Sequence, residues 1–156
     1  MSNGTQPSAL AKLSTEPTQL YISVCAPDEE TFKHVCRPQV PKAWKRLNET
    51  LELLSSFKCP TVIRMTLVRG LNMKGIEDYG KLVEKANPTY IEPKAYMHVG
   101  FSRLRLGFDG MPSHREIRDF AEQLARETGY GIIDESLESR VVLMSRLEKS
   151  IKFCVD

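Results

Sequence analysis

Three segments of the chain, residues 19–26, 61–68 and 90–98, alternate apolar and polar side chains as the strands of a sheet do. One set of alternate positions is mostly aliphatic or methionine. The other set holds Gln19, Tyr21, Ser23, Cys25, Arg64, Thr66, Glu92, Lys94, Tyr96 and His98. We therefore predict a sheet with one apolar face and one polar face.

Helical patterns separate these strands. Apolar residues recur at helical spacing, and Pro, Gly or a capping residue marks the ends of each run. Ser113 followed by Glu116 is the signature of a capping box at a helix start. The predicted helices run from the first strand to Arg37-Pro38 and then over 42–55, 76–86 and 114–128. Short strands at 131–134 and 139–145 follow, and 148–156 is expected to be a tail.

Alternation of strands and helices predicts an α/β fold, a mostly parallel sheet with helical crossovers. In a doubly wound sheet both strand faces would be buried and apolar, whereas one face here is polar. A barrel with outer helices and a polar lumen fits better, and its lumen would be a ligand site. The alternative is that Arg64, Glu92 and Lys94 simply neutralise one another in the interior.

Composition adds limits to this picture. A chain of 156 residues with 41% hydrophobic and 27% charged residues suits one globular domain, and a net charge of +2 gives no overall signature of nucleic-acid binding. The apolar runs are too short to span a bilayer, so we expect a cytoplasmic protein and no membrane partner. Cys25, Cys36, Cys59 and Cys154 lack metal-binding spacing, so we expect free thiols and no metal site.

Four blocks of the sequence resemble the archaeal-type tRNA 4-demethylwyosine synthases. They are Ser-Asn-Gly-Thr (2–5), Pro-Thr-Gln-Leu-Tyr-Ile-Ser-Val (17–24), Arg-Met-Thr-Leu-Val-Arg-Gly-Leu-Asn-Met (64–73) and Lys-Ala-Tyr-Met-His-Val-Gly-Phe-Ser-Arg (94–103). The resemblance implies the carboxy-terminal half of a partial radical S-adenosylmethionine (β/α) barrel, with parallel strands and outer helices. It would occupy residues 1–147, together with the wyosine-base-formation region, before the tail.

That family consists of lyases that use a 4Fe-4S iron–sulfur cluster and S-adenosyl-L-methionine. The resemblance implies tRNA processing: condensation of pyruvate carbons with N1-methylguanosine in tRNA to give 4-demethylwyosine in wyosine biosynthesis. The family binds the cluster through a CxxxCxxC motif, which this chain lacks. We therefore expect the chain alone to be inactive, as a fragment or one half of a split enzyme whose amino-terminal half supplies the cluster. The alternatives are a non-catalytic tRNA-binding module and an inactive remnant.

Residues at the carboxyl ends of barrel strands face the ligand. On position and resemblance, the S-adenosyl-L-methionine pocket is predicted to contain Asn3, Ser23, Arg64, Thr66 and Asn72. The Arg64 guanidinium suits a carboxylate. Asn72 has an alternative interpretation as a turn former, and we interpret Cys25 as a small polar filler.

Two further sites are predicted. Lys94 is the catalytic candidate, because pyruvate chemistry can use a lysine Schiff base. One alternative is a structural ion pair with Glu92, and another is that the family's Schiff-base lysine lies in the missing amino-terminal half. For tRNA, the loop after the third strand offers phosphate binders and rings for base stacking. The candidates there are Tyr96, His98, Arg103 and Arg105.

Overall fold

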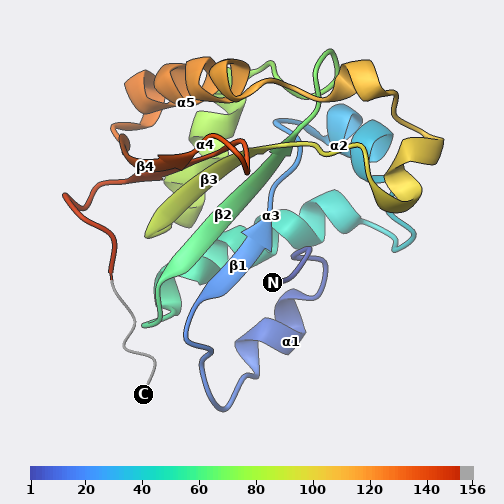
Figure 1. Ribbon diagram of the computed structural model, residues 1–156. Helices are drawn as coiled ribbons and strands as arrows, with labels where there is room; N and C mark the ends of the chain where they lie inside the picture. Colours follow the sequence, from blue (N-terminus) through green and yellow to red (C-terminus); the bar gives the residue numbers. More distant parts are fainter. Residues whose placement is uncertain (152–156) are drawn as a thin grey trace.

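A computed structural model describes residues 1–151 of the chain as one mixed α/β unit around a five-stranded sheet (Figure 1). The strands are β1 (Leu20–Ser23), β2 (Thr61–Leu67), β3 (Tyr90–Ala95), β4 (Gly131–Ser136) and β5 (Val141–Ser145). The helices are α1 (Pro7–Ala11), α2 (Glu29–Cys36), α3 (Ala43–Leu53), α4 (Ile76–Ala86) and α5 (His114–Thr128). Among these residues no helix is both long and apolar enough to cross a membrane.

The strand order is β1-β2-β3-β5-β4, and β1, β2 and β3 are parallel as predicted. The prediction is of a mostly parallel sheet, and the exception is β5, which runs antiparallel to both β3 and β4. Only residues 137–140 join β4 to β5, and so short a connection forms a hairpin, since a parallel pair needs a crossover of about a dozen residues. α5 instead returns the chain to β4 at the edge, and the hairpin places β5 between β4 and β3.

The predicted alternation is confirmed within the strands as far as Ala95, and it fails beyond, where Tyr96 of the polar set is buried and Met97 of the apolar set is exposed. Ile22, Ile63 and Ile91 are fully buried against the helices, whereas the polar positions beside them stay half-buried. Figure 1 shows α3, α4 and α5 on one side of the sheet, with no long helix on the other. Two predicted strands are shorter than expected: β1 ends at Ser23, and β3 ends at Ala95. The residues that follow them are therefore free to form loops.

The helix boundaries follow the capping signals. The Ser113 side chain accepts from the N–H of Glu116, whose carboxylate accepts from the N–H of Ser113, so the predicted capping box opens α5. Gly129, with φ 72°, ends this helix, and Asn87, with φ 40°, ends α4. Asp28 caps α2 through the N–H of Thr31. The sequence did not predict α1 or the 3-10 helices Gly100–Leu104 and Phe108–Gly110.

Part of the predicted tail lies within the described residues. The N–H of Ile151 donates to the Tyr90 hydroxyl at 2.7 Å, which holds this point of the tail against β3. The predicted tail residues 152–156 lie outside the described part of the chain. Cys25, Cys36 and Cys59 are free thiols, as expected, and Cys154 falls among the residues outside the description.

Candidate functional site on the polar face of the sheet

Two neighbouring rungs of polar side chains cross the exposed face of the parallel strands. The strand register aligns Ser23 with Arg64 and Arg64 with Glu92, and one step further it aligns Thr66 with Lys94. Neighbouring strands lie about 4.8 Å apart, so these side chains stand next to one another. Four of the predicted site residues, Ser23, Arg64, Thr66 and Lys94, therefore meet near the carboxyl ends of β1, β2 and β3.

An ion pair occupies the first rung. Arg64 Nε donates to Glu92 Oε2 at 2.5 Å, and the two side chains keep 26% and 14% of their exposure. The Glu92 carboxylate raises the pKa of Arg64, against the opposing effect of burial. The guanidinium also lies 5.3 Å from the centre of the Tyr21 ring, within cation–π range. Arg64 is thus held in place while its terminal NH1 and NH2 groups remain as donors.

Lys94 stands apart from this pair. Its Nζ donates to the carbonyl oxygen of Ser139 at 3.0 Å, in the turn between β4 and β5. The alternative in which Lys94 pairs with Glu92 is wrong, because the Glu92 carboxylate is paired with Arg64. Mutual neutralisation of all three charges is therefore also wrong. The second rung presents an ammonium group held by a neutral acceptor.

The structure changes the interpretation of Asn72. Its side chain is fully buried; Oδ1 accepts from the N–H of Val68 at 2.6 Å, and Nδ2 donates to the carbonyls of Cys25 and Thr66. Direct contact between Asn72 and a cofactor stays a prediction, and both ends of its amide are bonded to backbone groups. The turn-former alternative describes its contacts, and the residue ties the chain after β1 to the carboxyl end of β2.

Asn3 lies at the open edge of the sheet. Its neighbour Ser2 pairs with β1, accepting from the N–H of Ser23 through its carbonyl and donating to the carbonyl of Tyr21. Asn3 is exposed, and its Oδ1 accepts from the backbone and hydroxyl of Thr5. Because Ser2 is bonded to the backbone of Ser23, the next residue, Asn3, also lies near Ser23. The Nδ2 group of Asn3 remains available as a hydrogen-bond donor.

The loop after β3 contains the predicted tRNA residues. Arg103 and Arg105 are exposed, and the segment 97–108 carries no acidic residue. Tyr96 does not fit its predicted role in base stacking, because the residue is only 4% exposed and its ring packs edge-on against that of His98. The Tyr96 hydroxyl instead lies 3.2 Å from His98 Nδ1. Tyr96 therefore stabilises the loop by packing against His98 in the interior.

Exposed apolar side chains on the same loop were not among the predicted residues. Phe101 is 90% exposed, Leu104 77% and Phe108 69%. The amphipathic character of the loop becomes visible only in the structure, where its two 3-10 helices direct these side chains outward. Apolar groups exposed together beside arginines indicate a contact surface.

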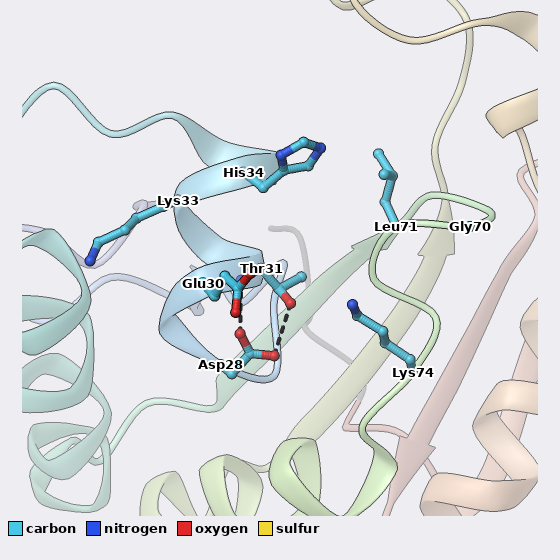
Figure 2. Close-up of a pocket in the computed structure, with 8 residues that line it drawn as sticks. All are labelled: Asp28, Glu30, Thr31, Lys33, His34, Gly70, Leu71 and Lys74. Atoms are coloured by element: carbon cyan, nitrogen blue, oxygen red, sulfur yellow. Dashed lines mark hydrogen bonds between the residues drawn. The ribbon is translucent and has the colours of Figure 1, made fainter.

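A surface pocket of about 630 Å³, absent from the sequence predictions, lies between α2 and the turn after β2 (Figure 2). His34 and Lys74 stand at opposite walls of this pocket, and Gly70 and Leu71 form its rim. Asp28 is committed to Thr31, whose N–H and hydroxyl donate to its two oxygens at 2.8 Å. These hydrogen bonds, led by that of the N–H, lower the pKa of Asp28.

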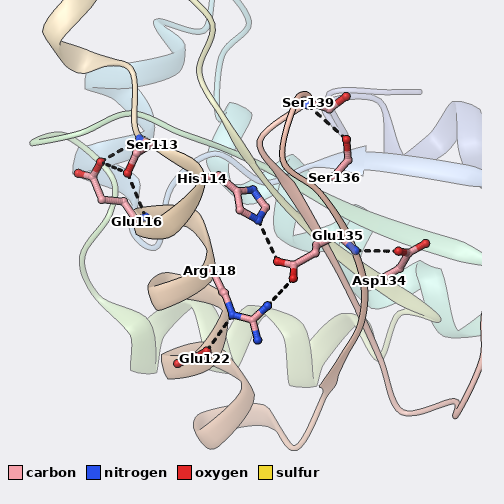
Figure 3. Close-up of polar contacts among 9 residues, drawn as sticks. All are labelled: Ser113, His114, Glu116, Arg118, Glu122, Asp134, Glu135, Ser136 and Ser139. Carbon is pink, nitrogen blue, oxygen red and sulfur yellow. Dashed lines mark hydrogen bonds and ion pairs between the residues drawn. The ribbon is translucent and has the colours of Figure 1, made fainter.

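A polar network on the other side of the loop fixes the hairpin to α5 (Figure 3). His114 Nε2 lies 2.8 Å from Glu135 Oε2, and Arg118 NH1 bonds the other oxygen of Glu135. His114 and then Arg118 lower the pKa of Glu135. Because Ser139 follows in the same hairpin, this network helps to place the acceptor of Lys94.

The residues of the site fit S-adenosyl-L-methionine, one of the two expected cofactors, and do not fit an iron–sulfur cluster. The hydroxyls of Ser23 and Thr66 and the free donors of Arg64 form a set that suits a ligand bearing a carboxylate. An iron–sulfur cluster does not fit: the chain has no CxxxCxxC, and residues 1–151 bring no three Cys, His, Asp or Glu side chains together as a metal-binding group.

The chain is similar to known proteins of wyosine base formation. Residues 85–146 match the family model for wyosine base formation, which covers β3, the loop, α5 and the hairpin. Over nearly its whole length the chain is similar to the S-adenosyl-L-methionine-dependent tRNA 4-demethylwyosine synthases, and the predicted resemblance to the carboxy-terminal half of these proteins is confirmed.

The synthase of Pyrococcus abyssi is 49% identical over 150 residues, which are 94% of this chain and 44% of that protein. The synthase of Methanocaldococcus jannaschii is 38% identical over 151 residues, 97% of this chain and 47% of that protein. A solved structure of TYW1 with a lysine-pyruvate adduct bound superposes with a TM-score of 0.82 at 38% identity, over 92% of this chain and 45% of that one. The chain therefore spans less than half the length of the relatives that it matches.

Proposed function

We propose that this chain is the carboxy-terminal part of a tRNA 4-demethylwyosine synthase, a radical lyase that condenses pyruvate carbons with N1-methylguanosine in tRNA. The observation that carries the proposal is its similarity to these synthases over 94% of its length. On this proposal the sheet is part of a (β/α) barrel, and its polar face lines the lumen. The protein would act in the cytoplasm.

The 4Fe-4S cluster would be bound outside this chain's own residues. We propose that an amino-terminal half, on the same polypeptide or on a separate subunit, supplies the 4Fe-4S cluster, and that this chain alone is inactive. The cluster and S-adenosyl-L-methionine would supply the radical. Ser23, Thr66 and Arg64 would hold the carboxylate end of the cofactor, with Asn3 at the rim and Asn72 as a positioning residue behind them.

Lys94 is the proposed pyruvate-binding residue. Its Nζ has a carbonyl rather than a carboxylate as its partner, so no ion pair has to be broken before the amine loses its proton. The neutral amine would attack the ketone carbon of pyruvate, and loss of the ketone oxygen as water would leave an imine. A lysine-pyruvate adduct in one solved relative supports lysine chemistry with pyruvate in such proteins, and the trapping experiment below tests whether Lys94 is the lysine concerned.

The loop after β3 would receive the tRNA. Arg103 and Arg105 would contact phosphates, His98 would line the approach, and the exposed Phe101 would take the stacking role that the buried Tyr96 does not fill. The same surface supports the second candidate, a tRNA-binding module without catalysis.

Reductive trapping distinguishes the two functions. Radiolabelled pyruvate and borohydride are added to the chain mixed with the amino-terminal half of an archaeal relative, and the labelled peptide is identified. We expect label on Lys94, its loss in Lys94→Arg, and its retention in the control Lys81→Arg, whose ammonium pairs with Asp78 on an exposed face. Label retained by Lys94→Arg would contradict the assignment.

Anaerobic assay of the same mixture with N1-methylguanosine-containing tRNA tests the wider proposal. Product that forms only when both halves are present supports the enzyme. Binding of tRNA without cofactor cleavage or product, under conditions in which an intact relative is active, would favour the binding module.

A further inference from the structure

A pocket that the proposed site does not use lies between the end of α2 and the start of α3. Its volume is about 330 Å³, within the range of about 300–1,000 Å³ for small-ligand sites. Most residues of the connecting loop 37–42 line it, together with residues of both helices. The pocket is therefore large enough for a small organic group.

Two aromatic residues form the apolar part of this pocket. Phe32 on α2 is only 5% exposed, and Trp44 at the start of α3 is half-buried beside it. Their ring centres lie 5.4 Å apart with a tilt of 49° between the planes. Because Phe32 is packed in the core, it supports the Trp44 ring, and both residues line the pocket. Trp44 is thus a fixed ring on which a flat ligand group can stack.

Two cations line the pocket beside these rings. Within residues 1–151, the side chains of Arg37 and Lys42 make no ion pair and no hydrogen bond. Glu29 is the acid among the lining residues, and it is paired with Lys33 at 2.8 Å. The first turn of α3 adds no acidic residue. Because the Lys33–Glu29 pair is neutral, the pocket has an excess of positive charge from Arg37 and Lys42.

The backbone of the loop places both cations in the left-handed region. Arg37 has φ 46° and Lys42 has φ 55°, a conformation that costs most residues about 1–2 kcal/mol and that asparagine and glycine adopt more easily. Pro38 and Pro41 restrict the loop between them. The two cations are therefore positioned before a ligand arrives, which lowers the entropy cost of binding.

The pocket adjoins the loop after β3. Arg105 NH1 donates to the carbonyl of Val35 in α2 at 3.5 Å, so the proposed tRNA surface continues onto the end of α2. We propose that the pocket binds an unpaired nucleotide of the tRNA, with its phosphate on Arg37 and Lys42 and its base on Trp44. An acidic peptide would satisfy the charges and leave the ring without a stacking partner. The inference rests on the proposed function, since the tRNA is the partner.

Trp44 itself reports on the pocket, because it is the only tryptophan of the chain. The chain is titrated with N1-methylguanosine-containing tRNA while the Trp44 fluorescence is followed, and a filter assay measures total tRNA binding. Poly-glutamate, which has negative charge and no bases, is titrated in parallel. We expect saturable quenching by the tRNA, at the concentrations at which the filter assay shows binding, and no comparable quenching by poly-glutamate.

Two variants test the cations without disturbing the fold. Arg37→Asn and Lys42→Asn each remove one charge and introduce a residue that tolerates the left-handed backbone. Each should weaken tRNA binding and reduce the slope of log affinity against log salt by about 0.7, the value for one phosphate contact on a single strand. The control Lys12→Asn removes an exposed cation at the end of α1 and should leave the slope unchanged.

The outcomes separate the pocket from the proposed function. Binding of tRNA in the filter assay without a change in Trp44 fluorescence, or with unchanged slopes in both variants, would overturn the pocket and leave the tRNA surface in place. Equal quenching by poly-glutamate would also overturn it, in favour of an acidic peptide. Trapping of pyruvate on Lys94 does not involve this pocket, so a chain that traps pyruvate and binds no tRNA would contradict this inference and not the lysine chemistry.

Discussion

Arg64 on β2 and Glu92 on β3 are paired across neighbouring parallel strands, with Nε 2.5 Å from Oε2. The pair fixes the charge arrangement of the whole polar face. The Glu92 carboxylate is satisfied by Arg64, while Lys94 donates to the Ser139 carbonyl. The consequence is a site in which the arginine is positioned and, among residues 1–151, the lysine has no acidic partner.

Removing the carboxylate of this pair should destabilise the fold. In Glu92→Gln the half-buried Arg64 loses its counter-charge, and we expect a loss of about 1–2 kcal/mol in the free energy of unfolding, less than for a fully buried pair because both side chains keep some exposure. Urea denaturation measures it. The control Glu49→Gln breaks an exposed pair with Lys45 and should cost under about 0.5 kcal/mol. Equal losses would show that the Arg64–Glu92 pair is solvated.

Asn72 should matter more for stability than its position in a turn indicates. Asn72→Ala leaves the N–H of Val68 and the carbonyls of Cys25 and Thr66 without their partner, and we expect a loss of about 2–4 kcal/mol in urea denaturation. Asn48→Ala, which removes a partly buried amide from the surface of α3, is the control and should cost less than half as much. A mild effect at Asn72 would mean that water replaces these bonds.

Phe101 should separate binding from folding. Because its side chain is 90% exposed, Phe101→Ala should leave the unfolding midpoint unchanged. If the loop after β3 receives tRNA as proposed, the same change should weaken tRNA binding about five- to one-hundredfold, the range for one lost base stack. Filter binding of the chain mixed with the amino-terminal half of an archaeal relative measures the affinity. Leu137→Ala, at a 70% exposed position in the β4–β5 turn, is the control and should bind normally. Identical affinities would exclude a stacking role for Phe101.

The capping box of α5 should give a defined pH dependence. The hydrogen bond from Arg69, followed by that from the N–H of Ser113, lowers the pKa of Glu116 from 4.5 to about 2. A carboxylate with a lowered pKa stabilises the fold above its unfolded pKa, and this contribution disappears as pH falls from about 4.5 toward 2.

The stability difference between the unmodified chain and Glu116→Gln should therefore be full at neutral pH and shrink through that window. Urea denaturation at a series of pH values measures the difference, with Glu122→Gln, further along α5, as the control. A difference that does not change between pH 6 and pH 3 would contradict the lowered pKa.

The sequence by itself determined the local features of this protein. Alternation in 61–68 predicted which residues of β2 face the helices, since a strand turns successive side chains to opposite faces. Ser113 with Glu116 predicted the start of α5, because a capping box lies within four residues of chain. The quoted blocks also identified the relatives that the comparisons then confirmed.

Only the tertiary structure decided which groups meet across the fold. Register between strands joined Arg64 to Glu92 rather than Glu92 to Lys94, and the loop after β3 buried Tyr96 while exposing Phe101. The direction of β5 followed from the shortness of its connection to β4. These outcomes depend on distances between segments far apart in sequence, and periodicity along one segment carries no information about them.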